Sequence, residues 1–139
     1  MFAAMTGADR PGPWEAEARR QLAAQLAGPE PATGVFVVDA EGGAGLAACA
    51  VGTIERRLPS PSSPAGLFGF VFNVCTDPAH RGRGYARAVT EALLDWFAAR
   101  GVTRVDLHAT PEAERLYRAL GFAAHSTALS LDVSARTGR

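Results

Sequence analysis

The sequence predicts a mixed α/β fold built around one sheet. In several short segments, apolar residues alternate with a period of two, and in others they recur at helical spacing. These segments follow one another in the order helix, hairpin, strand, helix, strand, helix, strand. With 139 residues, the chain has the length of one domain, so residues 1–139 are expected to form a single domain.

The first predicted elements are a helix and a hairpin. Pro13 suits a first helical turn, Glu15 lies near the positive end of the helix dipole, and the helix is expected to end at Gly28-Pro29. The apolar run 35–38, a glycine-rich turn and the run 46–54 then predict two paired strands.

The strongest strand signal covers residues 67–76, after a Pro/Ser-rich loop at 57–66. Simple alternation places four side chains on one buried face: Phe68, Phe70, Phe72 and Val74. The same alternation places Asn73 on the opposite face.

The second half of the chain predicts two more helices and two more strands. A helix is expected from Gly84 to Ala99 and a strand over 102–108. The apolar stripe of that helix comprises Tyr85, Ala88, Val89, Ala92, Leu93, Trp96 and Phe97. Thr110 is expected to cap a second helix that begins at Pro111 and ends at Gly121. Alternation of Leu129, Leu131 and Val133 predicts a last strand.

Composition argues against several classes of protein. Formal net charge is +0, with 14 basic and 14 acidic residues, so no bulk charge favours nucleic acid or an anionic membrane. Cys49 and Cys75 lie in apolar runs without metal-ligand spacing, which favours small buried residues in a reducing compartment. With no signal-peptide pattern and no membrane-length apolar run, we expect a cytoplasmic protein without a metal.

The segment 76–86, TDPAHRGRGYA, joins the strongest strand to the long helix. Helix starts expose unpaired N–H groups, so a glycine- and arginine-rich turn at this place favours phosphate binding. A dinucleotide-binding turn would need a small residue where Arg87 stands, and a P-loop would need a lysine. A nucleic-acid patch of Arg81, Arg83 and Arg87 and a plain solvated turn remain as alternatives.

Two sequence blocks favour a more specific interpretation. Arg81-x-x-Gly84-x-Ala86 matches the pyrophosphate-binding signature Q/R-x-x-G-x-G/A of the GNAT acyltransferase superfamily. About thirty residues later, residues 113–122 (AERLYRALGF) resemble that family's A-x-x-L-Y-x-x-x-G-F block. The resemblance covers about residues 35–133 and implies a mostly antiparallel sheet, splayed between two central strands and flanked by helices.

The resemblance also implies an N-acetyltransferase that moves an acetyl group from acetyl-CoA to a primary amine. The coenzyme A pyrophosphate would be held by main-chain N–H groups of Arg81, Gly82, Arg83, Gly84, Tyr85 and Ala86. The main chain of Val74 and Thr76 would pair with the pantetheine arm, and the Val74 N–H would polarise the thioester carbonyl. Tyr117 would act as general acid toward the coenzyme A sulfur. Thr110 stands where the family often has an Asn that touches pantetheine.

Several points stay open at this stage. The general base is undetermined among His108, Glu55, Glu112 and Glu114, and His80 is expected to be an exposed loop residue. The family's first strand is expected to be missing, which implies an N-terminally shortened domain, completed by a second subunit or degenerate. The expected partner is a small-molecule or peptide amine, with no nucleic acid and no membrane. The alternative function is a non-catalytic module that binds or senses acyl-CoA.

Overall fold

The structure is a computed structural model that describes residues 12–43 and 45–136. The chain forms two compact units, Met1–Leu107 and His108–Arg139. The segment 1–12, where the family's first strand is expected to be missing, lies outside the described residues except for Gly12. Among the described residues, no helix is both long and apolar enough to cross a bilayer.

A four-stranded sheet forms the centre of the first unit, in the order β1-β2-β3-β4. Its strands are β1 (Thr33–Asp39), β2 (Leu46–Arg56), β3 (Leu67–Thr76) and β4 (Arg104–Leu107). The pairs β1–β2 and β2–β3 are antiparallel, whereas β3 and β4 are parallel. The predicted hairpin and the mixed, mostly antiparallel sheet are therefore confirmed.

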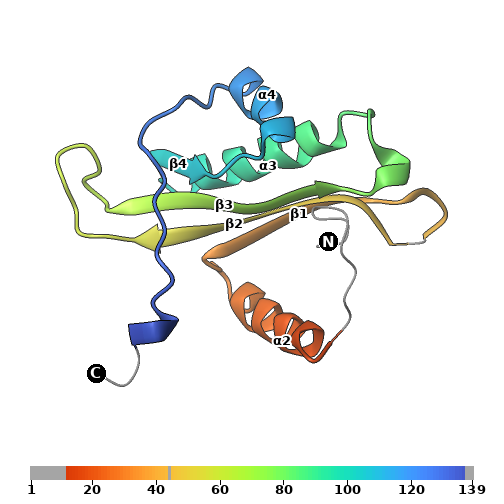
Figure 1. Ribbon diagram of the computed structural model, residues 1–139, viewed down its shortest axis with the longest axis horizontal. Helices are drawn as coiled ribbons and strands as arrows, with labels where there is room; N and C mark the ends of the chain where they lie inside the picture. The colour runs from red at the N-terminus through yellow and green to blue at the C-terminus, as the bar shows by residue number, and fades with distance from the viewer. Residues whose placement is uncertain (1–11, 44, 137–139) are drawn as a thin grey trace. The chain divides into compact units, whose positions relative to one another are not determined.

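Helices flank this sheet on both faces. Figure 1 shows α3 (Tyr85–Ala99) against one face of the sheet and α2 (Trp14–Leu26) beside the other face. A parallel strand pair needs a long crossover connection, and α3 supplies the one between β3 and β4. In the second unit, α4 (Pro111–Ala119) is the only α-helix that the described residues form.

The core lies between α3 and the sheet. The predicted apolar stripe of α3 is confirmed at its centre, because Val89, Leu93 and Phe97 are all buried. Thr90 is also fully buried, and its hydroxyl donates to the carbonyl of Ala86 at 2.6 Å, one helical turn earlier. A polar side chain can therefore sit in this core without an unpaired hydrogen-bonding group.

Three glycines let α3 approach the sheet closely. A Cβ at Gly52 would lie 2.7 Å from the Phe97 ring, and one at Gly69 would lie 2.8 Å from it. At Gly34 of β1, a Cβ would lie 2.8 Å from the Trp96 ring. Each of these three strands therefore has a glycine where it faces α3, and an aromatic ring of the helix occupies the space that a side chain would fill.

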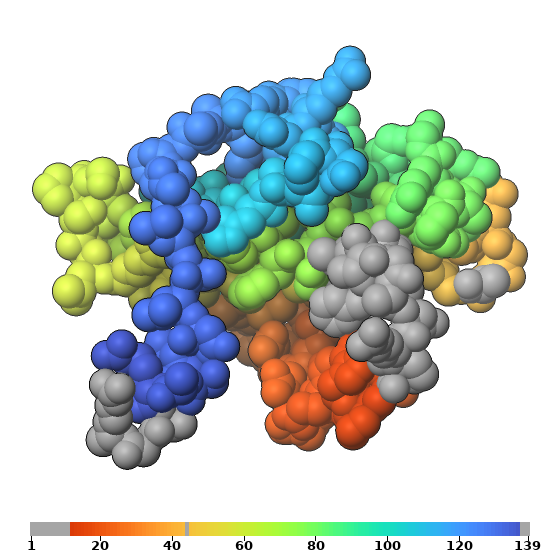
Figure 2. Space-filling view, in the orientation of Figure 1, coloured from red at the N-terminus to blue at the C-terminus, as the bar shows by residue number. Residues whose placement is uncertain are grey.

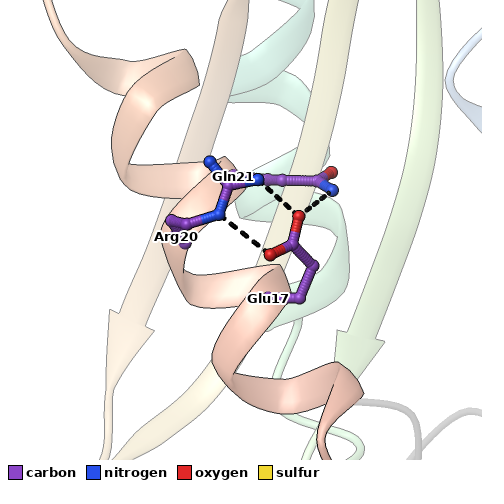
Figure 3. A network of polar contacts seen from close by, with 3 residues as sticks. All are labelled: Glu17, Arg20 and Gln21. Atoms are coloured by element: carbon purple, nitrogen blue, oxygen red, sulfur yellow. Dashed lines mark hydrogen bonds and ion pairs between the residues drawn. The ribbon is translucent and has the colours of Figure 1, made fainter.

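The helix α2 is exposed to solvent rather than part of the core. Glu17 accepts hydrogen bonds from Arg20 and Gln21 along one side of the helix (Figure 3). None of the α2 residues is buried, and Trp14 and Leu26 remain 46% and 40% exposed. Exposed ion pairs of this kind stabilise a helix only slightly, so α2 contributes little to the core.

A β-bulge changes which side chains of β3 are buried. The register with β2 shifts between the pairs Gly52–Val71 and Val51–Asn73, so Phe72 is an extra residue without a partner. One extra residue reverses the alternation beyond it. The expected single buried face is therefore wrong: Gly69 and Val71 are buried before the bulge, and Phe72 is 56% exposed.

Past the bulge, the faces are exchanged. Val74 pairs with the core residue Ala50 and packs against the core cluster, whereas Phe68 and Phe70 belong to the opposite face. Asn73 pairs with Val51 on that opposite face as well, so its expected separation from the phenylalanines is also wrong. A single inserted residue accounts for both errors.

The strand expected around residues 129–133 is absent from the described part of the chain. Leu129, Leu131 and Val133 are 89%, 75% and 56% exposed, and a short 3-10 helix (Ser134–Arg136) follows them. An alternating pattern forms a strand only where a neighbouring strand accepts its hydrogen bonds, and no such pairing is formed here by the described residues.

Candidate functional site

The candidate site begins where β3 extends beyond β4. The parallel pairing of these strands covers only Phe68–Val71 against Arg104–Leu107. From Asn73 to Thr76, β3 remains paired with β2, but β4 has ended. One edge of β3 therefore carries main-chain groups that no described strand satisfies.

The hydrogen bonding of Asp77 shows which main-chain groups face that open edge. Its N–H donates to the carbonyl of Ala47 on the β2 side at 2.8 Å. Main-chain groups alternate sides along a strand, so those of Cys75 also face β2, while those of Val74 and Thr76 face away from it. The open edge thus presents the N–H and carbonyl groups of Val74 and Thr76.

The turn after β3 depends on two glycines. After the 3-10 helix Pro78–His80, Gly82 and Gly84 both adopt a φ of +77°. Only glycine takes this conformation without steric cost, and a Cβ at either position would meet nothing within 4 Å. The need for glycine here is therefore conformational rather than steric. Figure 2 shows this part of the chain, in green, at the surface.

The turn delivers several unpaired donors to one place. Gly84 is the N-cap of α3, so the N–H groups of Tyr85, Ala86 and Arg87 lie in its first turn and have no intrahelical acceptor. Among the described residues, the N–H groups of 82–87 donate to no main-chain carbonyl. Together with the helix dipole, they form a site that favours an anion.

Charged side chains surround the turn. Arg81, Arg83 and Arg87 are exposed, and Arg87 pairs with Glu91 one helical turn later, at 3.3 Å. His80 was expected to be exposed, but its side chain is only 18% exposed, and its Nδ1 lies 3.0 Å from the Asp77 carboxylate. The prediction for His80 is therefore wrong, because the 3-10 turn folds the ring onto Asp77.

In the second unit, Tyr117 is the buried residue of α4. Its ring makes an edge-on contact with Phe122, with centroids 5.8 Å apart, and burial raises the pKa of its phenol. With a raised pKa the phenol keeps its proton to higher pH, so the side chain is in the protonated form at neutral pH. Tyr117 and Phe122 come from one sequence block, and their rings are in contact in the structure.

Thr110 occupies the predicted N-cap of α4, but its side chain makes no capping hydrogen bond. Pro111 fills the first turn and has no N–H, so fewer helix-start donors need a side-chain acceptor. The predicted cap is therefore right in position and wrong in its hydrogen bond. Its hydroxyl remains a candidate contact for a ligand.

The candidate general bases differ in their surroundings. Glu55 pairs with Arg57 at 3.0 Å, and Glu114 pairs with Arg118 at 2.8 Å. His108 and Glu112 are exposed. The described residues contain no cluster of three or more His, Cys, Asp or Glu side chains that could hold a metal ion.

Sequence reasoning missed one feature beside this site. The thiols of Cys49 and Cys75 lie 3.3 Å apart on adjacent strands. The signal was available only through the β2–β3 register, which pairs these two residues directly. The sequence pattern does not specify this register, because a ten-residue loop joins the two strands and a bulge shifts their pairing.

A sequence model of the acetyltransferase (GNAT) family matches residues 2–122. The chain belongs to the GNAT family. The match includes both the Arg81–Ala86 turn and the block that ends at Phe122. Membership confirms the family that the two blocks indicated.

Curated relatives resemble part of this GNAT chain. Mycothiol acetyltransferase of Beutenbergia cavernae is 40% identical over 62 residues, which are 42% of this chain and 21% of that protein. Serotonin N-acetyltransferase 2, chloroplastic, of Oryza sativa subsp. japonica is 39% identical over 59 residues, which are 42% of this chain and 30% of that protein. The chain therefore matches less than a third of the length of either relative.

Solved structures confirm the fold. A protein described as a predicted acetyltransferase from Clostridium acetobutylicum, crystallised with acetyl-CoA, superposes with a TM-score of 0.77. The superposition covers 91% of this chain and 80% of that one, at 20% sequence identity. The mixed sheet flanked by helices is thus the fold of the GNAT family.

Proposed function

We propose that this protein transfers an acetyl group from acetyl-CoA to a primary amine. The observation that carries the proposal is the continuity of the open β3 edge with the glycine turn. Val74 and Thr76 present free main-chain groups, and eight residues after Thr76 the N-cap Gly84 starts the donor-rich turn of α3. One ligand with an amide-bearing arm and a pyrophosphate suits both features.

The fit of coenzyme A to this chain rests on two kinds of group. The N–H groups of 82–87 and the nearby arginines Arg81 and Arg83 suit the pyrophosphate, because a Cβ-free turn lets phosphate oxygens approach the backbone. The outward-facing main chain of Val74 and Thr76 suits the pantetheine amides, which would pair with it as an added strand.

The chemistry needs one donor and one acid. Attack of a neutral amine on the thioester gives a tetrahedral oxyanion, and the Val74 N–H at the open edge is the group we assign to stabilise it. Collapse of that species breaks the carbon–sulfur bond and releases the coenzyme A thiolate. We assign Tyr117 to protonate this sulfur, because its phenol carries the proton that a general acid gives up.

The acceptor is proposed as an amine of a small molecule or peptide. The name of one curated relative, serotonin N-acetyltransferase 2, specifies transfer to nitrogen. This supports an amine rather than a hydroxyl acceptor for the present chain. The fold itself does not distinguish among amines, because one scaffold can carry different acceptor sites.

The proposal is tested by acetyl-CoA turnover against a panel of primary amines, with coenzyme A and acetylated product measured by chromatography. Direct product detection avoids thiol reagents that would also react with the protein's own cysteines. Thermal unfolding with acetyl-CoA runs in parallel, and a ligand at 100 times its Kd should stabilise the fold by about 2.7 kcal/mol.

The two measurements separate the alternatives. Stabilisation with turnover supports the enzyme. Stabilisation without turnover on any amine supports the module that only binds or senses acyl-CoA. If millimolar acetyl-CoA and coenzyme A both leave the unfolding midpoint unchanged, the proposed site does not exist.

A further inference from the structure

The strands β2 and β3 bring two thiols together. Cys49 and Cys75 are both free, they are register partners in the antiparallel pair, and their Sγ atoms lie 3.3 Å apart. Residues that exchange main-chain hydrogen bonds across such a pair have Cα atoms about 5.5 Å apart. That separation lies within the range of about 4.4–6.8 Å that disulfides span.

The two thiols are not equivalent. Cys49 is only 7% exposed, whereas Cys75 is partly accessible to solvent. The hydrogen bond from the Cys49 thiol lowers the pKa of Cys75 to about 6, and the same contact raises the pKa of Cys49. The accessible sulfur is therefore the one that ionises first, and the buried sulfur beside it keeps its proton to higher pH. This is the division between an attacking thiol and a resolving thiol.

We propose that Cys49 and Cys75 form a thiol pair that exchanges with small-molecule disulfides and closes a bond between β2 and β3. The sequence alone predicts only that both cysteines are small buried residues. Their opposed positions on neighbouring strands, with one sulfur accessible and the other buried, give them a different role.

The exchange has two balanced steps. The Cys75 thiolate attacks one sulfur of the small disulfide, so a mixed disulfide forms and one small thiolate leaves. Cys49 then gives up its proton and attacks the Cys75 sulfur, which releases the second small thiolate. The protein pair loses two electrons and two protons, and the small disulfide becomes two thiols.

Closing the bond would affect the neighbouring main chain. A disulfide has an S–S length of about 2.05 Å, so the sulfurs must approach by about 1.3 Å. Cys75 stands between Val74 and Thr76, whose main-chain groups form the open edge. Movement of Cys75 toward β2 shifts both neighbours, so the oxidised protein should bind acetyl-CoA less tightly. This consequence rests on the proposed function, whereas the thiol exchange does not.

The test uses the reduced 139-residue chain, glutathione disulfide as the probe, and the variants Cys49→Ser and Cys75→Ser. Intact mass and peptide mapping after alkylation follow the sulfurs. The wild type should end as a monomer that lacks two hydrogens and carries a Cys49–Cys75 cross-link. Cys49→Ser should stop as a glutathione adduct on Cys75. Cys75→Ser should react at least about tenfold more slowly, because its remaining thiol is buried.

Three outcomes would overturn the exchange: a wild type that keeps both thiols, one that retains a stable glutathione adduct, or one that links only between molecules. Circular dichroism of each variant, with Cys→Ala versions as a second set, separates a folding defect from lost chemistry.

The coupling to ligand binding is tested separately: the shift in unfolding midpoint with acetyl-CoA is measured on reduced, oxidised and re-reduced wild type. A reversible loss supports the coupling, and an equal shift in all three states rejects it. No shift in any state rejects the proposed function and leaves the thiol exchange standing on its mass data.

Discussion

The phenol of Tyr117 offers the sharpest test at the scale of single residues. Tyr117→Phe keeps the ring that contacts Phe122 and removes only the hydroxyl. If this hydroxyl protonates the coenzyme A sulfur, turnover should fall by about 100-fold or more, as for other lost general acids. Steady-state assays give the rate, and acetyl-CoA should still raise the unfolding midpoint by the wild-type amount. Unchanged turnover would assign the proton to another group.

The thiol of Cys75 provides a prediction about pH. Its lowered pKa of about 6 means that the thiolate forms as the pH rises through 6, well below the ordinary value of about 8.5. The rate of alkylation by iodoacetamide should therefore rise with a midpoint near pH 6. In Cys49→Ala the hydrogen-bond donor that is the strongest cause of the shift is removed, so the midpoint should move upward. Equal midpoints in both proteins would contradict the hydrogen bond as the cause.

At the scale of elements, the turn before α3 can be tested through its backbone alone. Gly84 and Gly28 both have positive φ, and a Cβ at either would meet nothing within 4 Å. Alanine at each should therefore cost a similar amount, about 1–2 kcal/mol of unfolding free energy. Only Gly84→Ala should also weaken acetyl-CoA binding, because only this turn carries the proposed phosphate donors. Unfolding curves with and without acetyl-CoA measure both effects, and equal ligand shifts in the two variants would count against the turn.

The contact between β2 and α3 gives a prediction about packing. A Cβ at Gly52 would lie 2.7 Å from Cζ of Phe97, a ring that is 1% exposed and has no room to move. Gly52→Ala should cost about 1–3 kcal/mol of unfolding free energy. Adding Phe97→Leu removes the clashing atom, so the two changes together should cost less than the sum of their separate effects. A double-mutant cycle from denaturant unfolding measures the difference, and strict additivity would argue that the ring is not the obstacle.

The same elements show where sequence reasoning succeeds and where it ends. The buried stripe of α3 was predictable because helical periodicity depends on a local repeat, and Val89, Leu93 and Phe97 follow it. The faces of β3 were not predictable, because the single extra residue Phe72 reverses them and leaves no compositional mark. The segment around Leu131 alternates as a strand would, yet strand formation depends on a partner rather than on the segment itself.

At the scale of the whole molecule, the candidate site was predictable in part. Two separated blocks identified the family. Each block contains a residue whose local conformation or burial restricts its type, a glycine at positive φ and a buried tyrosine, so a short motif is enough to detect it. The splay of the sheet was expected from that resemblance, and the end of β3–β4 pairing at Val71 agrees with it. The proximity of Cys49 and Cys75 required the tertiary register and could not be inferred from either run alone.

The balance of charge over the whole chain yields the last prediction. Arg81 and Arg83 lie at an anion-favouring turn, but 14 basic and 14 acidic residues cancel, and Arg87 is paired with Glu91. Nucleic-acid affinity depends on many phosphate contacts acting together, so a neutral chain with one small basic turn should bind duplex or single-stranded DNA negligibly even at low salt. The measurement is fluorescence anisotropy of labelled DNA at about 20 mM and about 200 mM salt. About 20 mM salt is low enough to reveal weak electrostatic binding.

Unlabelled acetyl-CoA serves as the competitor in this assay. Tight binding that weakens steeply with salt and ignores acetyl-CoA would make the turn a nucleic-acid patch. Weak binding that acetyl-CoA abolishes would instead place the DNA phosphates in the pyrophosphate site.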